Sequence, residues 1–167
     1  MTTTYERIAS TTLSSTTNTV TFSSIPSTYT DLVVASSFIK TGASGEAMFV
    51  TINGDNGSNY SYTWFGNSGS SLYAARVASD TRIQVYQQGT TSGIFNVCNL
   101  NVQNYSNTTT NKSIIVRNGT ADLSVSALVG LWRSTSAITS ITLTPDNYLS
   151  PVFVVGSTFS LYGIKAE

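Results

Sequence analysis

The chain contains no histidine and only one cysteine among its 167 residues. Without histidine, the usual nitrogen and sulfur ligand set of a zinc site cannot be built. The single cysteine, Cys98, has no partner within the chain, which excludes an intrachain disulfide framework. Eight acidic residues balance eight basic ones, and the basic residues are scattered singly. This distribution argues against electrostatic capture of nucleic acid, which needs clustered Lys and Arg.

Long apolar runs and charged side chains are also scarce. No run of about 18 apolar residues is present, so we expect no membrane-spanning segment. The stretch from Met1 to Arg7 lacks the apolar core of a secretion signal, so the sequence predicts no secretion signal here. Charged residues make up 10% of the chain and hydrophobic residues 40%. Disorder couples low hydrophobicity to high net charge, so this composition predicts a folded protein with a Ser-, Thr- and Asn-rich surface.

Apolar residues recur with a period of two, which is typical of β-strands. Leu32, Val34 and Phe38, for example, fall on one face of an extended segment. We expect about eight to ten strands and no helix. Stacked sheets joined by polar turns predict an all-β, single-domain antiparallel β-sandwich over residues 1–167, with a jelly roll as the favoured form. The alternating or apolar runs that support this prediction are 20–23, 32–38, 48–52, 94–102, 114–116, 123–129, 138–143 and 158–163.

Turn residues and the scarcity of lysine add two further predictions. Residues 66–71 predict a flexible loop, and residues 107–111 predict the tip of a hairpin. Natural edge strands often use Lys, Pro or bulges to avoid sticking to other chains, and Lys is rare here. We therefore expect neighbouring subunits to cover the strand edges in a homo-oligomer, with a trimer favoured.

One segment, residues 53–65, gathers amides, a carboxylate and four aromatic rings. Carboxylate and amide oxygens suit calcium, and aromatic rings beside amides suit a sugar. The favoured interpretation is simpler: a hairpin loop in which Asp and Asn cap their own turn, because only one carboxylate is present and EF-hand spacing is absent. We therefore expect no metal and no cofactor. The candidate glycan or interface contacts are Asn53, Asp55, Asn59, Tyr60 and Trp64.

Other chemically distinctive residues have structural interpretations as well. Trp132, beside Arg133, could anchor an interface, but a core Trp at a strand end is favoured. Cys98 lies on the apolar face of its strand and is expected to be a small buried hydrophobe, since no histidine can activate it. The acidic residues form no close pair of the kind that general acid–base catalysis draws on. We therefore expect no catalytic site and no enzymatic activity.

Several stretches together carry a resemblance to a known family. They are YERIAS at 5–10, VTFSSIPSTYTDL at 20–32, NGD at 53–55 with NYS at 59–61, Trp132 with AITSITL at 137–143, and GSTFSLYGI at 156–164. With these motifs the chain resembles small virion structural proteins of tailed bacteriophages, notably those infecting cyanobacteria and other aquatic bacteria. The resemblance covers nearly the whole chain and transfers no catalytic motif. It implies a virion protein that assembles in symmetric copies with other capsid or tail subunits.

Three functions follow from these observations and stay open at this stage. The first is a non-enzymatic capsid decoration (cement) protein, or a short spike or fibre subunit, because the chain has no long coiled coil or Gly-x-y stalk. The second is a receptor-binding tail-fibre module for host attachment, which would recognise host surface glycan through residues 53–64 and 107–111. The third is a depolymerase that acts on that glycan.

Overall fold

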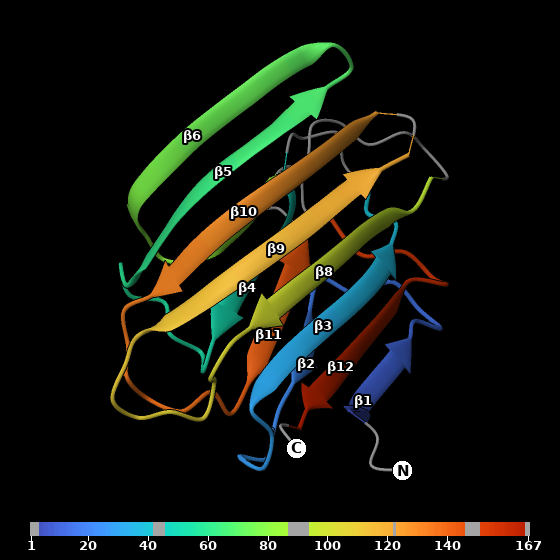
Figure 1. Ribbon diagram of the computed structural model, residues 1–167. Helices are drawn as coiled ribbons and strands as arrows, with labels where there is room; N and C mark the ends of the chain where they lie inside the picture. Colours follow the sequence, from blue (N-terminus) through green and yellow to red (C-terminus); the bar gives the residue numbers. More distant parts are fainter. Residues whose placement is uncertain (1–3, 42–45, 87–93, 122, 146–150, 166–167) are drawn as a thin grey trace.

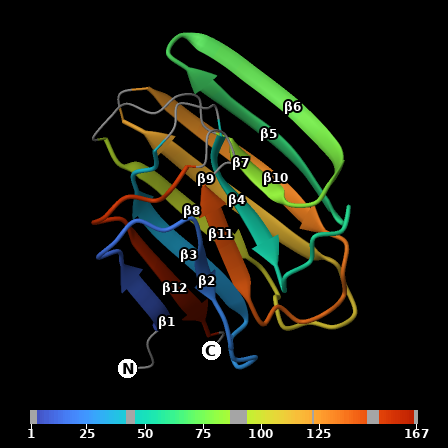
Figure 2. The ribbon, with the colours of Figure 1, turned by 180° about the vertical axis from the view of Figure 1, so that it is seen from behind.

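The computed structural model describes residues 4–41, 46–86, 94–121, 123–145 and 151–165. Within these residues the chain forms two antiparallel β-sheets that pack face to face, and it forms no helix (Figure 1). Seen from behind, the smaller sheet covers part of the larger one (Figure 2). The predicted all-β sandwich is confirmed, and its architecture is compatible with a jelly roll.

The larger sheet has eight strands in the order β1-β12-β3-β8-β9-β10-β5-β6, and the smaller sheet has four in the order β2-β11-β4-β7. The larger sheet comprises β1 (Tyr5–Thr12), β3 (Asp31–Phe38), β5 (Tyr60–Ser68), β6 (Ser71–Asp80), β8 (Asn96–Val102), β9 (Lys112–Thr120), β10 (Ser124–Trp132) and β12 (Thr158–Ile164). The smaller sheet comprises β2 (Val20–Phe22), β4 (Glu46–Ile52), β7 (Ile83–Tyr86) and β11 (Ile141–Pro145). The described residues thus contain more strands than the eight to ten expected.

The core lies between the two sheets and follows the predicted alternation. Leu32, Val34 and Phe38 of β3 are each at most 1% exposed, and so are Val50 of β4 and Ile141 of β11. These apolar side chains share one face of each strand because successive side chains of a strand point to opposite faces. The sheets bury these faces against each other, which is how the sandwich removes apolar area from water.

The strand β10 turns both of its valines outward. Leu128 pairs with Val116 of β9, and both point into the core. The intervening residues therefore face solvent, and Val125 and Val129 are 65% and 58% exposed. Their inward neighbour Ser126 is buried, and its hydroxyl donates a 2.7 Å hydrogen bond to Asn118 Oδ1. The alternation in β10 was thus predicted, but the apolar face that it creates lies on the outside of the molecule.

The expected flexible loop at residues 66–71 is instead mostly strand. The strand β5 continues to Ser68 and β6 begins at Ser71, so only two residues form the turn. Gly69 in this turn has a φ of 54°, a conformation that glycine adopts without strain. The sequence-based prediction was wrong here, and it missed β6 altogether.

Candidate functional site

The segment around Asp55 connects the two sheets. It leaves β4 of the smaller sheet at Ile52 and enters β5 of the larger sheet at Tyr60. It is therefore not a hairpin loop, because its flanking strands do not pair with each other. The chain turns at Asn53 and Gly54, whose φ values of 52° and 67° lie in the left-handed region. Such a turn is favoured by the Asn-Gly sequence.

The Asp55 carboxylate is a hydrogen-bond acceptor at the centre of this connection. It receives the Trp132 indole Nε1 at 2.7 Å, the Gly57 amide at 2.8 Å and the Asn59 side-chain Nδ2 at 2.9 Å. The Trp132 hydrogen bond is the main reason that the pKa of Asp55 lies below its ordinary value, and burial partly opposes this effect. The prediction that Asp and Asn cap their own turn is confirmed.

Tyr60 and Asn53 complete the same hydrogen-bond network. The Tyr60 hydroxyl donates to the Asp55 carbonyl at 3.0 Å and accepts from the Ile52 amide at 3.0 Å. Burial raises the pKa of Tyr60 to about 12. Asn53 donates from Nδ2 to the Ala137 carbonyl at 2.8 Å, while its Oδ1 accepts the backbone amide of Thr139 at 2.8 Å. These bonds tie the connection to the segment that leads into β11.

The structure thus brings most of the candidate contact residues together, but it places the aromatic ones inside the protein. Tyr60, Trp64 and Trp132 are 0%, 7% and 2% exposed. This burial contradicts direct ligand or subunit contact by their rings and confirms the core interpretation of Trp132. Asn53 and Asp55 are half-buried and hydrogen-bonded within the chain, so of the candidate contacts only Asn59 is exposed. The hydrogen bonds of Asn53, Asp55 and Tyr60 therefore hold the β4–β5 connection in place between the two sheets, and we call them the Asp55 network.

Two further sequence predictions concern the hairpin tip and the cysteine. The segment 107–111 lies between β8 and β9, which pair antiparallel, so the predicted hairpin is confirmed. Within it, Asn107 Oδ1 accepts the backbone amides of Thr109 and Thr110 at 2.7 and 2.9 Å. Cys98 is 2% exposed, and burial raises the pKa of its thiol to about 12. It is therefore the small buried hydrophobe that was expected.

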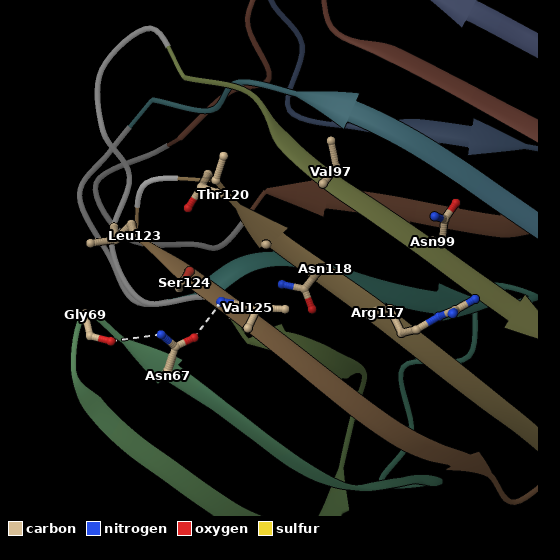
Figure 3. A pocket seen from close by; sticks show the side chains of 12 residues that line it. Asn67, Gly69, Val97, Asn99, Arg117, Asn118, Thr120, Leu123, Ser124 and Val125 are labelled. Atoms are coloured by element: carbon tan, nitrogen blue, oxygen red, sulfur yellow. Dashed lines mark hydrogen bonds between the residues drawn. The ribbon is translucent and has the colours of Figure 1, made fainter.

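A groove of about 730 Å³ lies on the outer face of the larger sheet, the face turned away from the smaller sheet (Figure 3). It crosses β8, β9 and β10, and Val97, Asn99, Arg117 and Val125 line it. A second hollow of about 420 Å³ adjoins it and shares Arg117. The hydrophobic pattern of the sequence does not point to these residues, because they come together only through the register that pairs Asn99 with Arg117.

The outer face also carries exposed apolar side chains that no described element covers. They are Phe65 (66%), Leu72 (86%), Val97 (55%), Ile115 (37%), Val125 (65%) and Val129 (58%). Cross-strand pairing makes them neighbours: Val129 lies opposite Ile115, and Leu72 lies opposite Asn67, two residues beyond Phe65. Monomeric proteins rarely expose a large contiguous apolar patch, so this face is a candidate contact surface.

The edge strand β6 differs from the other three edge strands. The small-sheet edges β2 and β7 have only three and four residues. The edge β1 carries two charges and a register shift between Arg7 and Ala9. By contrast, β6 has ten residues, and the stretch from Ser71 to Val77 pairs regularly with β5. Short length, charge and bulges are the devices that keep edge strands from pairing with other chains, and this stretch of β6 has one charge, Arg76, and no bulge.

Comparison with known proteins does not show a family for this chain. No protein-family model matches it, and no curated protein matches it either. Among the described residues there is no helix long and apolar enough to cross a membrane. The same residues include no group of three or more Cys, Asp or Glu side chains placed to hold a metal ion.

Proposed function

We propose that the chain is a non-enzymatic structural protein of a bacteriophage virion, and that it assembles on the particle as a homo-oligomer with a trimer favoured. Within that role it would be a capsid decoration (cement) protein or a short spike or fibre subunit. The observation that carries the assembly role is the long, unprotected edge strand β6 with its exposed apolar side chains. The virion setting rests on the sequence motifs that resemble phage structural proteins.

The β6 edge, defined as β6 with the adjoining Phe65, has the properties of a subunit contact. Its side chains from Ser71 to Arg76 are all exposed, so neither face of the strand is buried by the rest of the chain. A strand edge presents a row of free backbone donors and acceptors, which another strand can complete. Full burial of Leu72 or Phe65 would contribute roughly 1.5–3 kcal/mol each. Pairing at this edge would complete the backbone hydrogen bonds, and side chains of the added strand would pack beside Leu72 on the same face.

The hydrogen bonds of several acidic residues also support a structural role. Asp80 accepts the Tyr62 hydroxyl at 2.9 Å, and Asp31 accepts the Asn104 backbone amide at 2.7 Å. Asp55 is held by Trp132, as described above. Each of these three carboxylates joins neighbouring elements of the fold, which is a structural use of the group.

We expect the paired substitution Leu72→Lys with Ala74→Lys to dissociate the oligomer. Both positions are exposed, so the folded chain tolerates lysine there, while charged side chains on an edge strand oppose pairing with another strand. Charge placed against an interface costs several kcal/mol, so the dissociation constant should rise more than about a hundredfold. Sedimentation velocity measures this change directly.

The matched control is Ser27→Lys with Thr108→Lys, which adds the same charge to exposed loops away from β6. Its mass should equal that of the unmodified protein. If the β6 variant keeps the full oligomeric mass, the contact lies elsewhere. If the β6 double variant and the control double variant both dissociate, net charge and not the β6 edge controls assembly.

The position on the virion is testable by electron microscopy of particles that carry a labelled copy of the chain. Regularly spaced label on the head would support the decoration role, and label at the tail would support the spike or fibre role. Particles that lack a decoration protein should also lose resistance to heat or osmotic shock. Purified particles that contain none of the chain would contradict the proposed function.

A further inference from the structure

Arg117 is an isolated positive charge on the outer face of the larger sheet. It is exposed, and its guanidinium has no hydrogen-bond or ion-pair partner among the described residues. The positions that surround it on this face carry no charge of either sign. They are Val97, Asn99 and Asn101 on β8, Ile115 and Gly119 on β9, and Val125, Ala127 and Val129 on β10.

Asn99 supplies a second free polar group beside Arg117. The two residues are direct cross-strand partners, so their side chains stand on the same face (Figure 3). The other amides that line the groove are occupied: Asn67 bonds the Gly69 carbonyl and the Val125 amide, and Asn118 accepts from Ser126. Among the described residues that line the groove, Asn99 and Arg117 are therefore the exposed polar side chains that it offers to a ligand.

The chemistry of these two groups selects the ligand. A guanidinium matches a carboxylate in a planar, two-bond geometry, and no acid among the described residues forms an ion pair with Arg117. An amide both donates and accepts, which suits a hydroxyl group. The exposed methyl groups of Val97 and Val125 provide an apolar wall beside both. A ligand with a carboxylate, neighbouring hydroxyls and an apolar ring face would satisfy the whole groove.

Two hollows share Arg117, so a polymer could place neighbouring sugar units in both of them. The larger hollow, of about 730 Å³, extends from Arg117 toward Val97 and Val125, and the smaller one, of about 420 Å³, extends toward Asn101 and Asp31. Asp31 would repel an anion at that far end, which places the bound carboxylate at Arg117. A neutral or hydroxyl-bearing neighbour can occupy the smaller hollow.

We propose that this groove binds an acidic polysaccharide, with a uronate carboxylate on Arg117 and a sugar hydroxyl on Asn99. The site is separate from the proposed subunit contact, because pairing at the β6 edge adds strands in the plane of the sheet and leaves its outer face open. The inference therefore goes beyond the structural role and does not depend on it. The proposed glycan-binding site therefore lies on the outer face, and not in the segment 53–64 where the sequence predicted glycan contacts.

The test uses the full chain with polygalacturonate as the probe, and measures binding by isothermal titration calorimetry. We expect binding by the unmodified protein, and a loss of affinity of about tenfold or more in both Arg117→Gln and Asn99→Leu, the size expected for lost hydrogen bonds to a charged ligand. Arg7→Gln is the control, because Arg7 is an exposed arginine on the outer face at the opposite edge, in β1. It should bind like the unmodified protein.

Two other probes separate sugar recognition from simple charge attraction. Dextran, a neutral polysaccharide, should bind at least about tenfold more weakly because it lacks the carboxylate. Poly-L-glutamate has carboxylates without hydroxyls and should also bind more weakly. The proposal is overturned if polygalacturonate does not bind, if Arg7→Gln weakens binding as much as Arg117→Gln, or if poly-L-glutamate binds as tightly as polygalacturonate.

Discussion

Replacing the buried Trp132 by alanine (Trp132→Ala) is expected to lower the free energy of unfolding by about 4 kcal/mol. The indole is 2% exposed at the end of β10, where it packs in the core and donates its Nε1–H to Asp55. Its removal leaves a large cavity and breaks the link between β10 and the β4–β5 connection. Urea unfolding followed by circular dichroism measures the change.

The variant Trp132→Phe separates the two contributions of the indole. It keeps an aromatic ring in the core but removes the hydrogen bond to Asp55, so its loss should be smaller than that of Trp132→Ala. If Trp132→Ala changes the free energy of unfolding by no more than about 0.5 kcal/mol, the range typical of surface substitutions, Trp132 does not stabilise the fold in the way described here.

Asp55→Asn is expected to destabilise the fold by about 1–3 kcal/mol at neutral pH, because it leaves the buried Trp132 Nε1–H facing an amide that cannot satisfy all the donors. Asp55→Asn should also make the stability of the fold depend less on pH in the acid range. The pKa of Asp55 is lower in the folded chain than in the unfolded one. Its stabilising contribution is therefore complete above the unfolded pKa, about 3.9, and is lost as the pH falls through the lower folded pKa.

Thermal unfolding of both proteins across the acid range measures this effect. The unmodified protein should lose stability below about pH 4, and the loss should be smaller in Asp55→Asn. Parallel pH profiles for the two proteins would show that Asp55 makes no such contribution. Trp132→Phe offers a second check, since without the indole donor the pKa of Asp55 should return toward its ordinary value and the stability should depend less on pH in the same range.

The sequence predicted several strands whose alternation reflects burial on one face, but it assigned residues 53–65 to a loop and so missed β5, whose side chains alternate just as clearly. Leu32, Val34 and Phe38 of β3 were assigned to one face and lie in the core. The same reasoning missed β6, because both faces of that strand are exposed and no alternation marks it. Alternation of apolar and polar residues therefore appears only where one face of a strand is buried and the other is exposed. A strand with both faces exposed shows no such alternation in the sequence.

The candidate site shows a second limit of sequence-based prediction. The proximity of Asp55 and Asn59 in the chain was enough to predict that they cap a turn. The bond from Trp132 to Asp55 joins residues 77 positions apart, so it depends on how β10 meets the β4–β5 connection. The groove at Asn99 and Arg117 likewise depends on strand register, which the hydrophobic pattern of one chain does not specify.

The mass of the unmodified protein in solution is the most direct test of the central claim, which is that the chain assembles with copies of itself. Sedimentation velocity at micromolar concentration should give a multiple of the 17.8 kDa chain mass, with three copies favoured. A single species at 17.8 kDa that persists as the concentration is raised would contradict the account.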